Sequence, residues 1–461
     1  MEQKIDRWIE KHTDEMIADL QGAIRIPSVL DEEAADTPFG QDIGEALTYF
    51  LDTGRRMGFS VTDIEGYAGV VEWGEGEPRL GILVHTDVVP AGDGWTYPPF
   101  GGEVHDGRIY GRGVLDDKGP AVSVLYAMAA LKDAGFTPKG TVQLIIGTDE
   151  ETEHRGLDRY LEKRPAPHFG FSPDGEFPVI HGEKGIIHLS LVETDPCDDD
   201  LIQSVEGGHR PNMVPETCTC RFTRGLTTEE ADRVGSISRD MMGENDWELD
   251  GDTLTIRGIA AHGSMPEKGV NAVGRLLVLL DKAGLLPVAG LIPMLAKRVG
   301  LNYDGKAMGL DLSDAATGHL TLNLGELHIN ETESRAVLDV RYPATKSGDD
   351  VLAILSERAA EAGAEVKVRI HHLPLFLEKD SDIVQSLLGV YRDVTGDMAE
   401  PFTIGGGTYA REIPNAVAFG PLFPGRPDVM HQKDEYLFID DMVQFTRIYA
   451  RAIAKLMSER R

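Results

Sequence analysis

The stretch Leu80-Gly-Ile-Leu-Val-His-Thr-Asp87 places an unbroken apolar run directly before a histidine and an aspartate. A short apolar run of about four to eight residues is typical of a strand that is buried on both faces. The segment Thr141-Val-Gln-Leu-Ile-Ile146 has the same character, and Glu150 and Glu151 follow it closely. Sites in open α/β sheets form beyond the carboxyl ends of strands. We therefore predict that these polar side chains meet at one edge of an α/β sheet.

Helical patterns alternate with these strands. Apolar residues recur at helical spacing from Ile5 to Leu20, and a second helix is predicted over Ile43 to Met57. A third helix is expected to have Pro120 as its first residue and to end before Gly135, since proline suits the first helical position and glycine the end. Helices alternating with buried strands predict an α/β catalytic domain.

The pattern changes after Glu183 to alternating strands such as Thr253–Arg257, with helices at about Asn271–Ala283 and Asp349–Ala362. The segment Leu373-Pro-Leu-Phe-Leu377 marks the return to the first domain. We therefore predict a mixed-sheet catalytic domain that is discontinuous in sequence and is interrupted by a large α/β lid domain. The predicted parts are residues 1–184 and 378–461 for the catalytic domain and residues 185–377 for the lid.

Composition restricts the partners of this chain. Among its 461 residues, 77 acidic against 45 basic side chains give a net charge of −32, which would repel nucleic acid and anionic membranes. No apolar run approaches the ~18 residues of a membrane span. The first residues, Met1 to Asp6, are charged and show no apolar signal region. We expect a cytoplasmic protein that binds neither nucleic acid nor membrane.

Five short segments supply the oxygen and nitrogen ligands that borderline divalent metals prefer. A segment taken alone is more often structural: a surface turn for His85 and Asp87, an acidic helix start for Asp116 and Asp117, and a charged loop for Glu150 and Glu151. Their joint order favours two metals with a water between them, and Glu150 is left beside a ligand as a candidate general base. A carboxylate near a ligating imidazole holds its tautomer, so Asp87 is expected to support His85 rather than bind metal. The segments are His85-Thr-Asp87, Asp116-Asp117-Lys-Gly119, Asp149-Glu-Glu151, Ser172-Pro-Asp174 and His431-Gln-Lys-Asp-Glu435.

These motifs, with Gly111-Arg-Gly-Val-Leu-Asp-Asp-Lys-Gly119 at their centre, closely resemble a known family over nearly the whole chain. It is the dinuclear-metal peptidase and deacylase family that includes aminoacylases, carnosinases and PepV-type dipeptidases. The resemblance implies two divalent cations per chain, zinc or manganese. It implies that Asp116 bridges them, that His85 and Asp174 hold one, and that Glu151 and His431 hold the other.

The resemblance also implies roles for residues that bind no metal. Glu150 would be the general base, Asp87 the partner of His85, and the peptide bond between Asp116 and Asp117 would be cis. In the lid, Ala261-His-Gly-Ser264 resembles a family motif whose histidine, here His262, stabilises the oxyanion of the tetrahedral intermediate.

Three further positions match residues that would hold the substrate. Asn212 and Arg341 correspond to lid residues, and an arginine fork suits the free carboxylate of a peptide. The glycine cluster Gly405-Gly-Gly-Thr408, centred on Gly406, could present backbone N–H groups to the same carboxylate.

The long insertion between Asp174 and His431, with its own His262, resembles the PepV-like branch, whose members act as single chains. We therefore expect a monomeric dipeptidase that cleaves dipeptides with a free C-terminal carboxylate. Two alternatives remain open: a deacylase of the same fold acting on N-acyl amino acids, and a non-catalytic metal-binding protein. A protein that only binds metal has no need of an unligated base such as Glu150.

Overall fold

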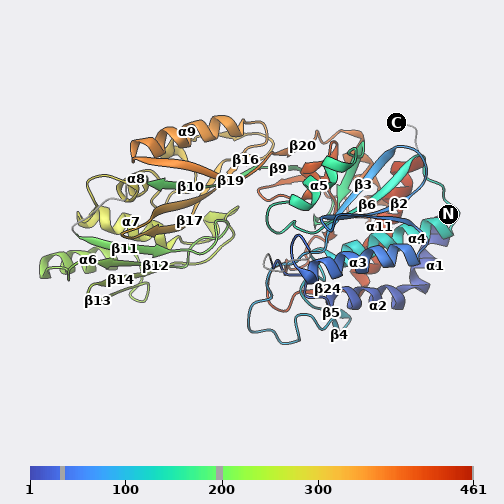
Figure 1. Cartoon of the computed structure of the whole chain (residues 1–461), viewed down its shortest axis with the longest axis horizontal. Helices are drawn as coiled ribbons and strands as arrows, with labels where there is room; N and C mark the ends of the chain where they lie inside the picture. The colour runs from blue at the N-terminus through green and yellow to red at the C-terminus, as the bar shows by residue number, and fades with distance from the viewer. Residues whose placement is uncertain (32–36, 194–200, 459–461) are drawn as a thin grey trace. The chain divides into compact units, whose positions relative to one another are not determined.

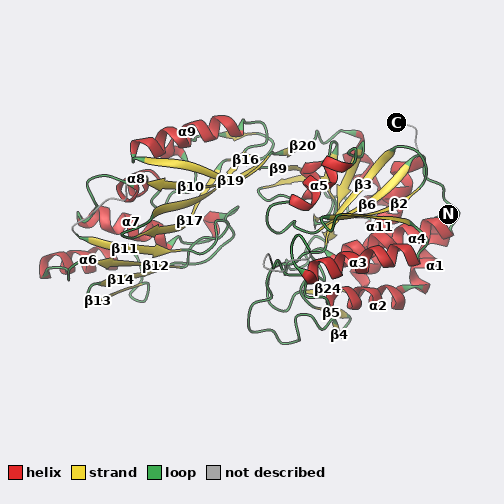
Figure 2. Ribbon diagram, viewed as in Figure 1, coloured by secondary structure: helices red, strands yellow, loops and turns green. Residues whose placement is uncertain are grey.

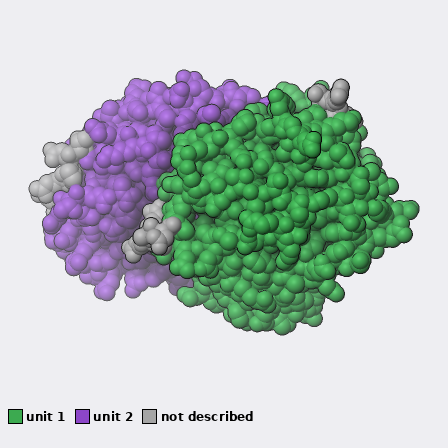
Figure 3. All heavy atoms as spheres, turned by 45° about the vertical axis from the view of Figure 1, so that its right-hand side comes forward, with its two compact units in different colours: residues 1–181, 377–403, 408–461 green, residues 182–376, 404–407 purple. Residues whose placement is uncertain are grey.

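The computed structural model describes residues 1–31, 37–193 and 201–458. Contacts divide the chain into two compact units (Figure 3): unit 1 comprises Met1–His181, Leu377–Thr403 and Thr408–Arg461, and unit 2 comprises Gly182–Phe376 and Ile404–Gly407. The sequence-based division left residues 404–407 in the catalytic domain, whereas the structure groups them with unit 2. The reason is local, because the backbone N–H of Lys184 donates to the carbonyl of Ile404 at 3.2 Å.

The main sheet of unit 1 mixes parallel and antiparallel strands (Figure 2). β3 (Pro78–His85) pairs in parallel with β6 (Thr141–Gly147) and β7 (Phe169–Ser172), and β22 (Ala416–Ala418) pairs in parallel with β7. Only β2 (Ala68–Trp73) runs the other way among these strands, antiparallel to its neighbours β1 (Ser60–Ile64) and β6. This arrangement confirms the predicted mixed α/β sheet. In spatial order these strands are β1 (Ser60–Ile64), β2 (Ala68–Trp73), β6 (Thr141–Gly147), β3 (Pro78–His85), β7 (Phe169–Ser172) and β22 (Ala416–Ala418).

Both faces of this sheet are buried, which explains the unbroken apolar runs. Along β3, Ile82 and Val84 face the larger core, whereas Leu83 faces a smaller one that also contains Leu157 and Tyr409. The helices of the larger core (Figure 1) are α1 (Glu2–Lys11), α2 (Thr13–Ile24), α3 (Gln41–Arg56), α4 (Lys118–Asp133), α10 (Asp382–Thr395) and α11 (Ile439–Ser458). The smaller core is covered by α5 (Arg155–Lys163) and η3 (Tyr409–Glu412).

Two helix predictions were wrong in detail. The helix expected from Ile5 to Leu20 is divided at His12, whose backbone leaves the helical region and whose ring stacks on Trp8. Pro120 is the third residue of α4 rather than the first, because α4 already begins at Lys118. Its missing N–H still costs nothing there, since the first four N–H groups of a helix have no partner within it.

Unit 2 is built on an antiparallel sheet with helices packed against one face. The spatial order is β13 (Trp247–Asp250), β14 (Thr253–Arg257), β12 (Thr217–Phe222), β11 (Ile202–Gly207), β17 (Thr321–Ile329), β18 (Ser334–Tyr342), β10 (Gly185–Glu193) and β19 (Ala364–His372). The helices are α6 (Thr228–Met241), α7 (Ala272–Ala283), α8 (Leu291–Arg298) and α9 (Gly348–Glu361). Leu338 and Val340 of β18 face this core, so Asp339 and Arg341 lie on the opposite face of the sheet.

Shorter elements complete both units. They are β4 (Glu103–His105), β5 (Arg108–Tyr110), β8 (Gly175–Glu176), β9 (Ile180–Glu183), β15 (Ser313–Asp314), β16 (Gly318–His319), β20 (Leu375–Phe376), β21 (Phe402–Ile404), β23 (Pro421–Leu422), β24 (Tyr436–Phe438), η1 (Pro266–Lys268) and η2 (Lys306–Met308). Within the described ranges, none of the helices has the length and apolar character needed to cross a membrane.

Candidate active site

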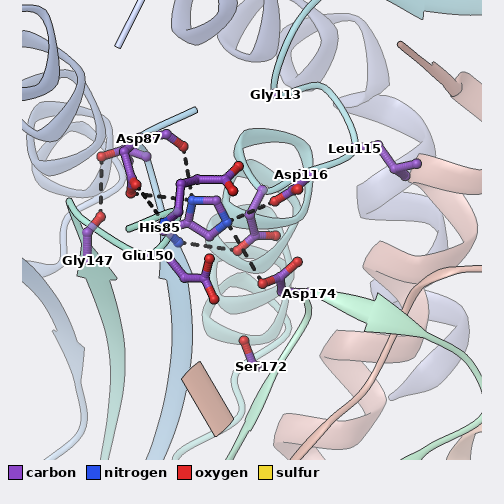
Figure 4. Close-up of polar contacts among 12 residues, drawn as sticks. His85, Asp87, Gly113, Leu115, Asp116, Gly147, Glu150, Ser172 and Asp174 are labelled. Carbon is purple, nitrogen blue, oxygen red and sulfur yellow. Dashed lines mark hydrogen bonds and ion pairs between the residues drawn. The ribbon is translucent and has the colours of Figure 1, made fainter. Parts of the chain in front are cut away.

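The predicted metal ligands of unit 1 meet at one edge of its sheet. His85 is the last residue of β3, Asp174 follows the end of β7, and Glu151 follows the end of β6. Because β3 runs parallel to both neighbours, these three carboxyl ends lie side by side. Figure 4 shows His85, Asp116 and Asp174 directed toward one another. The topology therefore gathers side chains that are far apart in the sequence.

Asp116 lies between two groups of these side chains. Its Oδ1 is 2.9 Å from Nε2 of His85, and its Oδ2 is 2.9 Å from Nε2 of His431. Asp174 Oδ2 lies 3.8 Å from the same nitrogen of His85, and Glu151 Oε1 lies 3.1 Å from Nε2 of His431. The donor atoms within each group of three are within 4.8 Å of one another. The peptide bond between Asp116 and Asp117 is cis, as the resemblance implied.

The acids of this cluster are only partly balanced by its two histidines, His85 and His431. Burial, and then the nearby charge of Asp116, raises the pKa of Asp174 well above its usual value and that of Glu151 to about 7. Burial alone would lower the pKa of His431, but Glu151 and Asp116 raise it to about 12. Bound cations would relieve this repulsion. The two groups of donor atoms share Asp116, which directs one carboxylate oxygen at each group. This set of donors fits two divalent cations.

Asp87 connects the end of β3 to the loop that carries Glu150 and Glu151. Its backbone carbonyl lies 3.0 Å from Nδ1 of His85, and its Oδ1 lies 3.5 Å from the same nitrogen. Its other oxygen, Oδ2, accepts the backbone N–H of Glu151 at 3.0 Å. The structure thus places Asp87 where it can orient the His85 ring, through the main chain as well as through the carboxylate.

Glu150 lies outside both ligand groups, and its side chain is 12% exposed. Nε2 of His154 is 3.5 Å from Glu150 Oε1, and Nδ1 of His154 is 3.0 Å from Glu412 Oε1. Burial opposes a charge on this histidine, but Glu150 and Glu412 together raise its pKa to about 9. The sequence analysis missed both His154 and Glu412, because residues 258 positions apart gave no sign of meeting.

A buried ion pair holds the loop before Asp116. Nη1 of Arg112 donates to Glu435 Oε2 at 2.7 Å, and both side chains are at most 2% exposed. The Glu435 carboxylate also accepts backbone N–H groups of Gly113 at 3.0 Å and of Leu115 at 2.9 Å. The pairing of β24 with β5 aligns the two loops. Glu435 belongs to the segment His431–Glu435, but no sequence pattern indicated that it would be buried and paired with Arg112.

In unit 2, the segments carrying the predicted substrate residues also meet. The backbone N–H of Gly263 donates to the carbonyl of Asn212 at 2.7 Å, and a Cβ at Gly263 would approach Asp339 Oδ2 to 2.6 Å. Only glycine fits this position without displacing the carboxylate. Arg341 donates to both oxygens of Asp339, at 2.6 and 2.9 Å. Asn212 and Arg341 are therefore neighbours of one glycine turn.

The remaining two predicted residues lie beside this turn. Nδ1 of His262 is 2.7 Å from Oγ of Ser264, which fixes the ring relative to its own loop. A Cβ at Gly405 would lie 3.4 Å from the carbonyl oxygen of Ser264, so the loop containing Gly406 packs against the same segment. Arg341 is buried against Asp339, a partner that the sequence analysis did not assign to it.

Comparison with known proteins identifies the family. Residues 81–455 match the model of Peptidase family M20/M25/M40. The chain is 38% identical over 462 residues to the Bacillus subtilis (strain 168) protein named "Putative dipeptidase YtjP", covering 96% of this chain and 97% of the relative. Its fold is similar to that of the Saccharomyces cerevisiae di-peptidase Dug1p, with a TM-score of 0.62 and 13% identity over 100% of this chain and 99% of the other.

Human carnosine dipeptidase 1 shares the fold as well, with a TM-score of 0.59 and 16% identity over the full length of both chains. At such identities these structures establish the fold alone, whereas the matched family model and the 38% identical relative extend over most of the chain. This chain therefore belongs to Peptidase family M20/M25/M40 and is a hydrolytic peptidase.

Proposed function

We propose that this peptidase is a dinuclear metal-dependent dipeptidase acting on dipeptides with a free C-terminal carboxylate. The observation that carries the proposal is the position of Asp116, whose two oxygens each lie 2.9 Å from a histidine of a different ligand group. One group would hold a cation through His85 and Asp174, and the other through Glu151 and His431. The name of the 38% identical relative supports a dipeptide substrate.

The chain's own residues then have distinct tasks. When bound, two divalent cations, zinc or manganese, would polarise the scissile carbonyl and lower the pKa of a nearby water molecule. Glu150 accepts a proton from this water and returns it to the leaving amine. Asp87 orients His85. His262, from unit 2, donates a hydrogen bond to the oxyanion of the tetrahedral intermediate.

The substrate's C-terminal carboxylate is assigned to unit 2. Arg341 offers a planar fork of donors that matches a carboxylate, and Asn212 lies at the same glycine turn. The backbone at Gly406 supplies further N–H donors. In this proposal Arg341 gives up one of its hydrogen bonds to Asp339 and donates to the substrate carboxylate instead.

The whole site is assigned to one chain, and we infer a monomer with a cytoplasmic location. Light scattering at concentrations where the enzyme is active should give the mass of a single chain. Mixing inactive Glu150→Ala and His262→Ala chains should restore no activity. Activity restored by mixing would show that two subunits share one site.

A substrate panel tests the proposed reaction. Protein stripped with EDTA is supplied with zinc or manganese and assayed against free dipeptides, tripeptides and N-acyl amino acids. We expect hydrolysis of the dipeptides, dependent on the added metal and faster than for the other classes. Faster cleavage of N-acyl amino acids would assign a deacylase instead, and dipeptide hydrolysis that persists without metal would contradict the proposed cations.

A further inference from the structure

The ring of His154 lies between two carboxylates, that of Glu150 and that of Glu412 in η3. Its Nε2 is 3.5 Å from Glu150 Oε1 and its Nδ1 is 3.0 Å from Glu412 Oε1. The residue is 7% exposed. These contacts join the proposed base to a second carboxylate through an imidazole, and the reaction proposed above assigns no task to either His154 or Glu412.

The backbone of His154 is strained. Its φ of 62° lies in the left-handed region, which residues with a Cβ disfavour and which is common at functional sites. The turn is closed by the His154 N–H, which donates to the carbonyl of Asp149 at 2.8 Å, and by Arg155, whose Nε donates to Asp149 Oδ2 at 2.7 Å. The loop that carries Glu150 is therefore closed on itself, with the His154 ring fixed at its end.

Packing from η3 restricts the ring further. The Tyr409 ring meets the His154 ring edge to face, with centroids 4.9 Å apart. Tyr409 itself is buried over Gly147, where any Cβ would clash with the phenol. Because Tyr409 and Glu412 belong to the same short helix, one element supplies both the packing surface and the hydrogen-bond partner of His154.

We propose that His154, held by Glu412, is a positioning residue that fixes the Glu150 carboxylate for proton transfer. A ring N–H directed at one oxygen of Glu150 leaves the other oxygen free to accept the proton of the water. A base must lie within hydrogen-bond reach of that proton, so a misplaced carboxylate lowers the rate of the chemical step. The inference rests on the proposed role of Glu150 as the base.

The test compares variants of the full-length, metal-loaded enzyme on one free dipeptide. His154→Ala should lower kcat about 10- to 100-fold, the loss expected from a displacement of about 1 Å, with KM within about twofold. His154→Gln keeps an N–H donor and should restore part of kcat. Glu412→Gln should lower kcat less, and the double variant should be no slower than His154→Ala, because both act through one contact.

Control variants come from the other end of the same strands, away from the candidate site. His168 and Glu77 precede β7 and β3 and form an exposed histidine–carboxylate pair 3.7 Å apart, so His168→Ala and Glu77→Gln should leave kcat unchanged. Metal content by mass spectrometry and thermal melting accompany each variant. An unchanged kcat in a folded His154→Ala protein, additive losses in the double variant, or loss of bound metal would each overturn the positioning role.

One further variant separates this inference from the proposed function. In a Glu150→Ala background, His154→Ala should cause no additional loss, since nothing remains to be positioned. If Glu150→Ala retains full turnover, the proposed base is wrong. If Glu150→Ala is inactive while His154→Ala keeps the wild-type kcat, only the positioning role is overturned.

Discussion

Buried carboxylates occur in both units, but their charges are compensated in different ways. In unit 2, Arg341 donates two hydrogen bonds to Asp339. Burial alone would raise the pKa of Asp339, but Arg341 and His188 hold it well below its usual value. In unit 1, burial and neighbouring acids raise the pKa of Glu151 and Asp174. Asp339 of unit 2 therefore has an arginine as its partner, while the acids of unit 1 have histidines, and bound cations would relieve the repulsion that remains among them.

The two topologies explain this difference. Asp339 and Arg341 are two residues apart on β18, so they share one face of a strand and meet locally. The acids of unit 1 come from the ends of separate strands and loops, and the sheet brings them together around two histidines, His85 and His431. Local pairing satisfies a charge, whereas converging strand ends create a site for a ligand.

The largest effect is expected at Glu150, which lies outside both ligand groups. Glu150→Ala should lower kcat about 10²- to 10⁴-fold, the usual contribution of a general base, while both metals stay bound. Steady-state kinetics and metal analysis by mass spectrometry measure the two quantities. Glu153→Ala, which removes an exposed acid from the same loop, is the control. Loss of one metal per chain from Glu150→Ala would make Glu150 a ligand.

Neutralising one acid in each unit should have opposite effects on the metal-free protein. Asp339→Asn should lower the free energy of unfolding by about 3–5 kcal/mol, because it leaves Arg341 buried without its carboxylate partner. Asp174→Asn should raise the melting temperature, because an amide removes the carboxyl group whose charged form is opposed by burial and by Asp116. Denaturant and thermal unfolding of EDTA-treated protein measure both. Destabilisation by both variants would break the comparison.

Added cations should stabilise the protein through the acidic cluster alone. At a free concentration about 100 times Kd, one bound zinc or manganese ion raises the free energy of unfolding by about 2.7 kcal/mol. Calorimetry should show this gain in the wild type and in Asp339→Asn, and its loss in Asp116→Ala. Equal stabilisation of Asp116→Ala would place the cations elsewhere.

A smaller effect tests whether the pair in unit 2 also serves the substrate. Arg341→Ala should lower kcat/KM for free dipeptides by about 10- to 100-fold, which corresponds to about 1.4–2.8 kcal/mol. The loss should shrink for dipeptides with amidated C-termini, which offer no carboxylate to the guanidinium. Equal losses for both substrates would mean that Arg341 supports only the structure of unit 2.

Much of unit 1 could be predicted from local patterns. The apolar runs at β3 and β6 identified strands buried on both faces, and the acids after them indicated a site at the strand ends. The break at His12 could not be predicted, because the apolar spacing continues through it and only the backbone shows the change. The start of α4 was misplaced because Pro120 is compatible with more than one position in a first turn.

Local sequence patterns identify the residues that can do chemistry and place each one relative to a strand end, because hydrophobic periodicity is a local property. Which of these residues meet depends on how the strands and loops pack in three dimensions. This packing brought Asp116 between His85 and His431, buried Arg112 against Glu435, and seated His154 between Glu150 and Glu412. These contacts join segments up to 323 positions apart, and no local pattern encodes a pairing that arises only when distant strands pack.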